Sequence, residues 1–496
     1  MDDADTVNGT TDARRDVVIV GGGPTGLMLA AELRLWDVDV VVVERDGEPS
    51  RVVRSLGLHA RSLELLDQRG LLDAFLAHGQ QYPLRNTFAG LDRPAPADID
   101  TSHAYLLGIP QPTTDRLLED HALSSGVDLR RGRRVVSVTQ DAEGTTVGLA
   151  GGAEIRADYV VGCDGGRSTV RREAGIRFLG EDATTSWLLA EVELRADVAE
   201  TLAVSAEVRK TDLAFGVGPV GDGVFRLVVR EASPSADREV TIEAVRERLR
   251  AVAGTDLGAH SPRWLSRFSD ATRVAETYRA GRVLLTGDAA HVHAPLGGQG
   301  LNLGIQDAVN LGFKLAGTLQ GWAPADLLGT YESERRPVAE RVLRNTRAQS
   351  ELLQTTPGPV AARALLAELA EVDEVNRRMI EMVTAIGVRY DMGEGVSADA
   401  GAATAAMVGR RLRDIPVKGG RLFELLRDGR GALIDSTGSL DVDGYSGRVH
   451  RGEAKQRDLG VGAVLLRPDG HIAWAGDDRD GLDGALQRWF GHPGAA

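Results

Sequence analysis

The stretch "DVVIVGGGPTGLMLAAELRLWDVDVVVVER", Asp16 to Arg45, decides the fold of this chain. It begins with a run of β-branched residues, which is typical of a buried parallel strand. A glycine turn follows, then apolar residues at helical spacing, then a second valine-rich run. About 30 residues is the length expected of a strand–helix–strand crossover in a parallel sheet. The sequence therefore predicts an α/β domain that begins here.

Gly21, Gly23 and Gly26 form a G-x-G-x-x-G turn between the first strand and the helix. Glycine at these positions permits a tight turn, close approach of a pyrophosphate and close packing of helix on strand. Glu44 ends the second strand, where an acid accepts hydrogen bonds from a ribose hydroxyl. The combination predicts a dinucleotide site but does not separate FAD from NAD. A glycine turn between packed elements is the simpler alternative.

Composition limits the class of protein. The chain has 496 residues, so two or three domains are expected, and its net charge is −14, which argues against nucleic acid or an anionic membrane as a partner. Its single cysteine, Cys163, excludes an intramolecular disulfide and favours a reducing cytoplasm. The first residues are polar and acidic, unlike a secretory signal, and no apolar run is long enough to span a membrane.

The rest of the chain changes pattern several times. From about Leu189 to Arg230 the residues alternate with a period of two, which predicts a mostly antiparallel sheet. Long helical stretches follow from Leu303 to Val388. The small-residue segment Gly395 to Gly409 is typical of a mobile loop. Beyond it, "GALIDS" and "AVLLRPDGHIAWAG" predict the strands of a smaller α/β module.

Two further strand ends carry polar and glycine-rich turns. In "YVVGCDGGRSTVR", Asp164 to Ser168 leave a strand for a helix. In "LLTGDAAHVHAPLGGQGLNLGIQDA", Asp288 ends a strand, well placed to bind ribityl or ribose hydroxyls, or a pyrophosphate through water. Pro295 to Asn302 then offers a series of N–H groups at a helix N-terminus, and a flavin ring needs such donors at its carbonyl oxygens.

The motifs "GGGPTG", "CDGGRS" and "GDAAHVHAPLGGQGLN", in this order, resemble the single-component FAD-dependent aromatic monooxygenases of the phenol-hydroxylase type. "GIPQPTTDRLL", "WLSRFSDATR" and "LLRPDGHIAWAG" are similar to aromatic polyketide hydroxylases. The resemblance implies an α/β fold (α+β overall): a Rossmann-like FAD-binding domain, an inserted antiparallel-sheet substrate domain and a C-terminal thioredoxin-like domain. The expected boundaries are a disordered tail at 1–14, the FAD-binding domain with its following helices at 15–180 and 276–393, the substrate domain at 181–275, a flexible loop at 394–409 and the C-terminal domain at 410–496.

The resemblance also implies a set of FAD contacts. Gly21, Gly23 and Gly26 hold the pyrophosphate, Glu44 the ribose and Arg45 the adenine side. The other implied contacts are Pro24, Thr25, Arg54, Gln111, Asp164, Asp288, Pro295, Gly298, Gly300, Leu301 and Asn302.

The chemistry that the resemblance implies is hydroxylation by O2. NADPH or NADH reduces FAD, oxygen adds, and a flavin hydroperoxide hydroxylates a large phenolic or naphthoquinone polyketide or an antibiotic such as a rifamycin. The enzyme is expected as a monomer or homodimer. Two alternatives remain open: an FAD-retaining homologue that catalyses a non-redox cyclisation in natural-product biosynthesis, and a flavin-binding protein without turnover.

Three arginines are candidate catalytic residues. Arg54 matches a family position beside the flavin ring, and Arg209 and Arg226 interrupt apolar segments expected to be strands. A buried arginine is costly unless paired, so a sheet that faces a pocket explains Arg209 and Arg226, which could stabilise a phenolate there. Solvent-facing positions in alternating strands are the alternative. Phe88 and Phe215 are candidate pocket residues, although phenylalanine is more often part of a core.

No metal site is predicted. His291 and His293 lie close together, but no third ligand is evident, so turn and packing roles are favoured. Cys163 lies at the end of a buried strand and is expected to be inert. The C-terminal module lacks Cys-x-x-Cys, which excludes dithiol chemistry and leaves it a structural role.

Overall fold

The computed structural model describes residues 14–212, 214–221, 223–232, 239–393 and 401–494. The strands of its largest sheet are β1 (Arg15–Val20), β2 (Val40–Val43), β8 (Asp128–Arg130), β9 (Val135–Gln140), β10 (Thr145–Leu149), β11 (Glu154–Gly162), β18 (Arg279–Ala280) and β19 (Val283–Leu285). The spatial order is β18-β19-β11-β1-β2-β8, with β10 and β9 attached to β11. β19, β11, β1, β2 and β8 run parallel. The strand–helix–strand unit predicted from Asp16 to Arg45 is confirmed.

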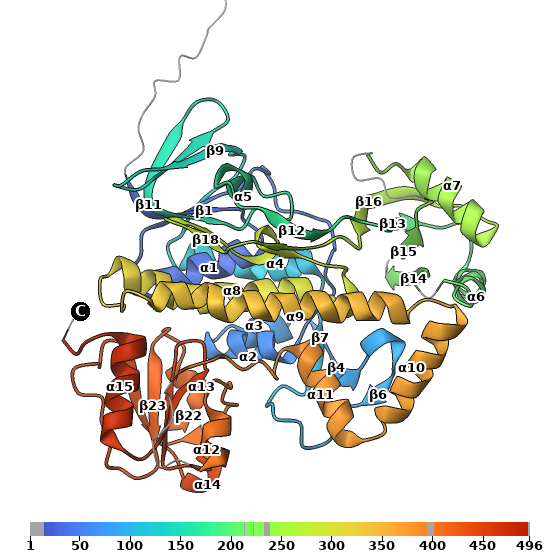
Figure 1. Cartoon of the computed structure of the whole chain (residues 1–496). Helices are drawn as coiled ribbons and strands as arrows, with labels where there is room; N and C mark the ends of the chain where they lie inside the picture. The colour runs from blue at the N-terminus through green and yellow to red at the C-terminus, as the bar shows by residue number, and fades with distance from the viewer. Residues whose placement is uncertain (1–13, 213, 222, 233–238, 394–400, 495–496) are drawn as a thin grey trace, which may run out of the picture.

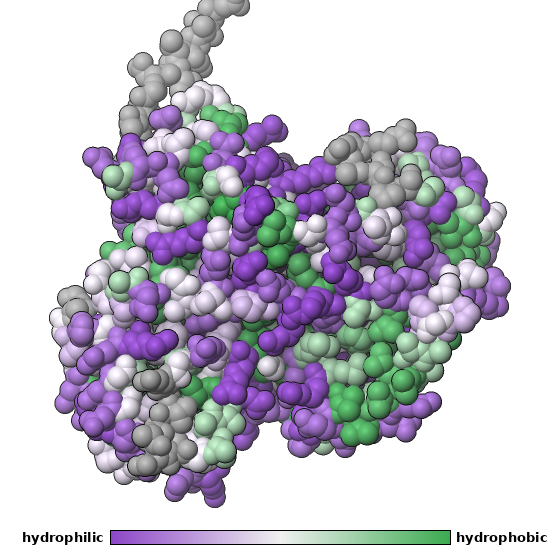
Figure 2. Space-filling model, viewed as in Figure 1, coloured by the Kyte–Doolittle hydropathy of each residue, from purple (hydrophilic) through white to green (hydrophobic). Residues whose placement is uncertain are grey.

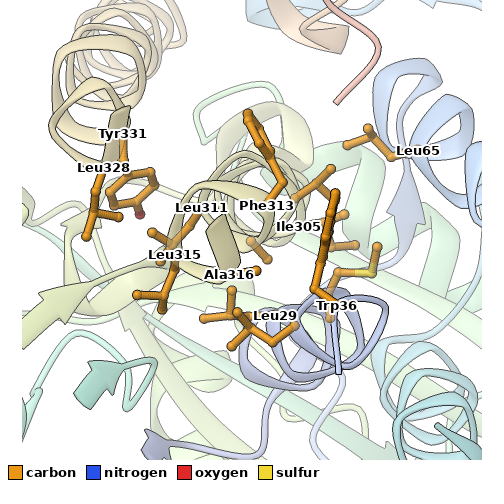
Figure 3. Packing of buried hydrophobic residues seen from close by; sticks show 14 of the residues in the cluster. Leu29, Trp36, Leu65, Ile305, Leu311, Phe313, Leu315, Ala316, Leu328 and Tyr331 are labelled. Carbon is orange, nitrogen blue, oxygen red and sulfur yellow. The ribbon is translucent and has the colours of Figure 1, made fainter. Parts of the chain in front are cut away.

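α1 (Pro24–Arg34) and α5 (Thr169–Glu173) pack on this sheet. The other helices of this part of the chain are α2 (Ala60–Gln68), α3 (Leu72–Leu76), α4 (Gln111–Ser124), α8 (Gln299–Leu319) and α9 (Thr330–Leu352). α8 and α9 run across the middle of the molecule (Figure 1). α8 is buried on almost every side, because two glycines let α1 approach it closely. A Cβ on Gly304 would lie 2.2 Å from Thr25 Oγ1, and one on Gly312 would lie 2.6 Å from the Cβ of Glu32. Figure 3 shows the apolar side chains of α8, with Leu29 of α1 beside Ala316.

A second sheet is antiparallel, as predicted, and has the order β14-β15-β13-β16. Its strands are β13 (Ser186–Glu193), β14 (Gly216–Gly221), β15 (Val224–Arg230) and β16 (His260–Ser269). Helices α6 (Val198–Val208) and α7 (Ile242–Ala253) pack on one face of it, where Leu188, Leu227 and Leu249 form a separate core. The strands β12 (Phe178–Glu181), β17 (Thr272–Ala275) and β20 (His291–Val292) pair with one another and lead back to the first sheet.

A third group of elements lies on the other side of α9. It comprises β3 (Gly57–Leu58), β4 (Gln80–Pro83), β5 (Arg85–Asn86), the 3-10 turn η1 (Phe88–Gly90), β6 (Arg93–Pro94), β7 (Tyr105–Gly108), α10 (Pro357–Leu369) and α11 (Asp373–Thr384). α10 has no buried residue and exposes Val360, Leu365 and Leu369. Figure 2 shows apolar residues gathered over this corner of the surface.

The C-terminal module forms its own sheet, in the order β24-β23-β25-β26. Its elements are α12 (Ala402–Met407), β21 (Pro416–Val417), β22 (Gly420–Arg421), α13 (Leu422–Leu425), β23 (Gly431–Asp435), β24 (Val449–Glu453), α14 (Gln456–Leu459), β25 (Ala463–Leu466), β26 (Ile472–Gly476) and α15 (Arg479–Phe490). β23 pairs parallel with β24 and antiparallel with β25. Its likeness to thioredoxin stays a prediction.

Two expectations about local structure are wrong. The segment around Arg209 was expected to be a strand, but it is the C-terminal end of α6, whose alanine- and glutamate-rich sequence favours a helix. The predicted loop Gly395 to Gly409 lies partly outside the described residues, and its later part contains α12. Among the described residues, none of the helices combines the length and apolar character needed to cross a membrane.

Candidate flavin site

Four adjacent parallel strands end along one edge of the large sheet, and each end carries a predicted cofactor residue. The order β19-β11-β1-β2 places Asp288, Asp164, the Gly21 turn and Glu44 in a row. Neighbouring strands lie about 4.8 Å apart, so the row suits an extended ligand. In open α/β sheets ligands bind outside the carboxyl ends of strands.

The glycine turn fits a pyrophosphate. A Cβ on Gly21 would lie 2.4 Å from the carbonyl oxygen of Cys163, and one on Gly26 would lie 2.1 Å from the carbonyl oxygen of Gly21. Gly23 differs, because a Cβ there would meet nothing within 4 Å. It is the N-cap of α1, and no side chain caps that end of the helix. The uncapped N–H groups at the start of α1 therefore face open space, which suits a phosphate.

The acids at the two ends of the row, Glu44 and Asp288, differ in their hydrogen bonding. Glu44 accepts hydrogen bonds from the backbone N–H groups of Gly22, at 2.7 Å, and Asp46, at 2.9 Å, which fixes its carboxylate beside the glycine turn. Asp288 is exposed and, among the described residues, has no hydrogen-bond or ion-pair partner. Its carboxylate is therefore available for a hydroxyl-bearing ligand.

The carboxylate of Asp164, between these ends, already accepts hydrogen bonds from within the protein. It accepts from the backbone N–H groups of Thr169 at 2.6 Å and Val170 at 3.2 Å, so it caps α5. Thr25 lies at the crossing of α1 and α8, where its hydroxyl would be 2.8 Å from a Cβ on Gly287. Both residues shape the row, and a direct contact with FAD stays a prediction for each.

The loop Pro295 to Asn302, which is predicted to contact the flavin ring, contains two left-handed glycines and the uncapped N-terminus of α8. Gly297 and Gly298 adopt left-handed conformations, with φ of 72° and 63°, which glycine adopts without strain. Gly298 is the N-cap of α8 and no side chain caps that end. The N–H groups from Gly298 through Gly300 and Leu301 thus begin a long helix whose dipole favours negative charge.

Asn302 holds this loop to the neighbouring strand. Its Oδ1 accepts from the backbone N–H of His59 at 2.8 Å, and its Nδ2 donates to the carbonyl oxygens of Gly57 at 3.2 Å and Gly298 at 2.9 Å. The side chain is therefore used within the protein, and any contact with FAD falls to its backbone.

Asp307 of α8 holds the segment from Gly287 to His291, which precedes the loop, and was missed by the sequence analysis. It is fully buried, accepts from the backbone N–H of Gly287 at 3.2 Å, and pairs with His291 at 2.7 Å and Arg335 at 2.6 Å. Burial alone would raise the pKa of Asp307, but Arg335 and His291 outweigh it and lower the pKa. The signal in the sequence is an acid within the apolar helix α8.

Three other predicted FAD contacts are Arg45, expected on the adenine side, Arg54, expected beside the flavin ring, and Gln111, and their contacts with FAD stay predictions. Arg45 is exposed and lies beside Asp46, and Arg54 is exposed and has no hydrogen-bond or ion-pair partner among the described residues. The backbone N–H of Gln111 donates to Ser55 at 3.0 Å, which ties α4 to the Arg54 segment. These positions are open to a ligand.

Asp115, one turn along α4, is a second residue that the sequence analysis missed. Burial raises the pKa of its carboxyl to about 7, and its Oδ1 has no hydrogen-bond partner among the described residues. Gln111 Nε2 lies 3.5 Å from its other oxygen, and Arg54 acts weakly in the opposite direction on its pKa.

The predicted substrate residues are distributed differently from expectation. Phe215 is 1% exposed in the core between the second sheet and its helices, so the pocket position predicted for it is wrong. Phe88 packs against Ala370 and Met379 in a small core of its own. Arg209 is exposed at the end of α6. Pocket roles for Phe88 and Arg209 stay predictions.

Arg226 lies on the opposite face of the second sheet from the core. Phe225, Leu227 and Val229 of β15 face the covering helices, so the intervening Arg226 faces away from them. Its guanidinium forms an ion pair with Glu191 and lies over the ring of Trp264, 5.8 Å from its centroid. Glu191 is the partner that a buried arginine requires.

The surroundings of His293 and Cys163 shift the pKa of both side chains. Burial lowers the pKa of His293 and raises the pKa of the Cys163 thiol well above its usual value, which disfavours a reactive thiolate. In the part of the chain that the structure describes, no three His, Cys, Asp or Glu side chains are grouped to hold a metal ion.

Comparisons with known proteins agree with this geometry. The FAD binding domain family matches residues 14–346, and the family described as aromatic-ring hydroxylase, C-terminal, matches residues 405–493. The chain is 53% identical over 479 residues to rifampicin monooxygenase of Rhodococcus hoagii, covering 96% of this chain and 98% of that relative. The structure of OxyS anhydrotetracycline hydroxylase from Streptomyces rimosus superposes with a TM-score of 0.87 at 42% identity, covering 97% of this chain and 100% of that one. The structure of the Diels-Alderase PyrE3 superposes with a TM-score of 0.83 at 38% sequence identity, and the match covers 96% of this chain and 99% of that one.

The chain therefore belongs to the FAD-dependent aromatic-ring hydroxylases, and it is an FAD-dependent aromatic monooxygenase. The predicted family, fold class and cofactor are confirmed.

Proposed function

We propose that this protein hydroxylates a large, oxygen-rich aromatic polyketide or antibiotic such as a rifamycin, with NADPH or NADH as the reductant. Bound FAD supplies electron transfer and the activation of O2. The residues of this chain must hold FAD along the sheet edge, orient the substrate and exclude water. The domain boundaries and the FAD contacts named above are part of the proposal.

The observation that carries the proposal is an aromatic wall on the face of the second sheet opposite α6 and α7. Trp187 and Phe268 stack with ring centroids 5.2 Å apart and an interplanar angle of 12°. Trp264 lies further along the same face, beside Arg226. Flat aromatic surfaces suit a multi-ring substrate, because stacked rings bury large apolar areas.

Unused hydrogen-bond donors on this wall indicate an oxygen-rich ligand. The indole Nε1 atoms of Trp187 and Trp264 and the Nε of Arg226 are buried, and none of them has a hydrogen-bond partner among the described residues. An unsatisfied buried donor costs about 1–3 kcal/mol, so an acceptor supplied by a ligand would relieve that cost. Phenolic and carbonyl oxygens of a polyketide are such acceptors.

The chain connects one end of the aromatic wall to the predicted flavin loop, Pro295 to Asn302. β16 leads within a few residues to β17, and Arg273 of β17 pairs with Val292 of β20. β20 directly precedes Pro295, so the Trp187–Phe268 end of the wall is the end connected to the loop. A substrate stacked there would lie toward the predicted ring site.

The test mixes the purified FAD-loaded protein with NADPH in air, with and without rifampicin and with a panel of anthraquinone phenols. We expect faster NADPH oxidation with the true substrate and, by mass spectrometry, a product one oxygen heavier. Trp187→Leu should weaken substrate binding about tenfold while FAD content stays unchanged.

A cyclisation that uses no reductant is the second candidate. The similarity to the Diels-Alderase PyrE3 favours it, since that relative shares the fold over nearly the whole chain. A flavin that neither NADPH nor NADH bleaches, even with ligand bound, would overturn hydroxylation and favour this alternative.

A further inference from the structure

A cavity of about 300 Å³ lies between α8, α9 and α11, and the proposed function does not use it. Gln299 and Asn302 line it, so it shares the first turn of α8 with the candidate flavin site. Small-molecule sites begin at about this size. A ligand in it would lie next to the flavin loop without occupying the aromatic wall.

Gln306 supplies an unused polar group to this cavity. The residue is 6% exposed and lines the cavity. Among the described residues, its carboxamide has no hydrogen-bond partner. The other cavity amides differ, since Gln299 donates to the carbonyl oxygen of Leu296 at 3.3 Å and accepts from Asn345 at 3.4 Å. Gln306 is therefore free to donate and accept at once.

Two cations line the same cavity. Arg341 comes from α9 and Arg378 from α11, and both are exposed. Neither has an acceptor or carboxylate partner within the described part of the chain. Glu381 also lines the cavity, which leaves one excess positive charge at neutral pH. Two unpaired guanidiniums at one opening favour a ligand that carries a phosphate.

The remaining lining is apolar. Leu303, Val338 and Val342 contribute aliphatic side chains from α8 and α9. A flat heteroaromatic ring would bury its faces against them, and its polar edge would need a partner such as Gln306. A glutamine side chain pairs with adenine through the N6 and N7 atoms of the ring.

We propose that this cavity binds the adenosine 2′-phosphate end of NADPH. Arg341 and Arg378 bind the 2′-phosphate, as arginine does in NADP sites. Gln306 pairs with the adenine edge, and Glu381 accepts from a ribose hydroxyl. The inference rests on the proposed function, because it names the reductant of that reaction. It concerns binding only, and it makes the protein selective for NADPH over NADH.

The test titrates the FAD-loaded protein with adenosine 2′-monophosphate by calorimetry, with adenosine 5′-monophosphate for comparison. We expect the 2′ isomer to bind at least tenfold more tightly. Arg341→Gln and Arg378→Gln should each weaken it about tenfold, because each removes a charge-assisted contact. Glu381→Gln should tighten it, since the glutamine amide oxygen can still accept from the ribose hydroxyl while the charge that opposes the phosphate is removed.

Arg344→Gln is the matched control. Arg344 is exposed on α9, three residues from Arg341, and does not line the cavity. It should leave binding of both nucleotides unchanged. Gln306→Leu keeps the cations and should weaken both isomers equally, since both carry adenine.

Equal binding of the two isomers, or affinity for the 2′ isomer that Arg341→Gln and Arg378→Gln leave unchanged, would overturn the proposal. These results do not depend on turnover. If the protein forms no oxygenated product but binds adenosine 2′-monophosphate as expected, the substrate assignment fails and the cavity assignment stands. If product forms but the nucleotide does not bind here, the reverse holds.

Discussion

At the scale of single residues, the buried carboxyl of Asp115 makes stability depend on pH. Burial raises its pKa from 3.8 to about 7 in the folded protein. Between these two values the unfolded chain loses the Asp115 proton while the folded protein keeps it. The free energy of unfolding therefore falls as pH rises through this range, by about 1.4 kcal/mol per pH unit at most.

Asp115→Asn should remove this dependence and stabilise the protein at pH 8. The measurement is urea unfolding of the FAD-free protein and of the variant from pH 4 to pH 8. The difference between the two should grow with pH up to about pH 7. Asp120→Asn replaces an exposed acid on the same helix; it is the control and should not stabilise the protein at pH 8. Parallel curves for wild type and Asp115→Asn would contradict the assignment.

The residue types alone predicted the turn after β1, because its backbone geometry requires glycine. Gly21 and Gly26 were predicted from their spacing, and both lie where a Cβ would meet backbone atoms. Their role and that of Glu44 in binding FAD stay predictions. Asp115 and Asp307 were missed because each is a single acid in a helix. Whether such an acid is buried depends on distant segments, as with Arg335 beside Asp307.

At the scale of elements, the N-terminus of α1 is a place where a substitution can weaken FAD binding without affecting the fold. A Cβ on Gly23 meets nothing within 4 Å, and its φ of −84° suits any residue. Gly23→Ala should therefore leave the melting temperature of the FAD-free protein unchanged. Because the pyrophosphate must approach this backbone closely, FAD affinity should fall at least tenfold. Fluorescence of released FAD during dialysis measures it.

Gly329→Ala is the matched control for this element. Gly329 is also an N-cap glycine with φ of −64°, in front of α9, and a Cβ there meets nothing within 4 Å. No ligand is expected at the N-terminus of α9, so FAD affinity should stay as in the wild type. Unchanged FAD affinity in Gly23→Ala would show that the pyrophosphate lies elsewhere.

Elements with strong periodicity were predicted well, and those set by tertiary contacts were not. β1, α1 and β2 each carry a continuous apolar pattern, so their boundaries were evident. α6 was misread because its apolar residues alternate over a short stretch, and Phe215 was misplaced with it. Only the packing of α6 and α7 on one face of β15 shows which side of the strand is covered.

At the scale of the whole molecule, the C-terminal module is joined to the FAD-binding domain through buried charges. Arg467 follows β25, is fully buried, and donates to both oxygens of Glu334 on α9, at 2.6 and 2.8 Å. Lys314 of α8 donates to the same carboxylate at 2.8 Å. Asp469 completes the cluster through an ion pair with Arg467. The same helices, α8 and α9, shape the flavin loop and the cavity beside it.

This arrangement predicts that the module and the FAD-binding domain unfold together. Arg467→Met leaves Glu334 and Asp469 buried with one fewer cation, and breaking a buried pair costs about 3–5 kcal/mol. We expect a large fall in melting temperature, with FAD release and the fluorescence of Trp474 and Trp489 in the module changing in a single transition. Arg479→Met breaks a half-exposed pair with Asp441 in the same module and should cost less than about 1 kcal/mol. If Arg467→Met unfolds the module while FAD stays bound, the buried charges do not couple the two parts.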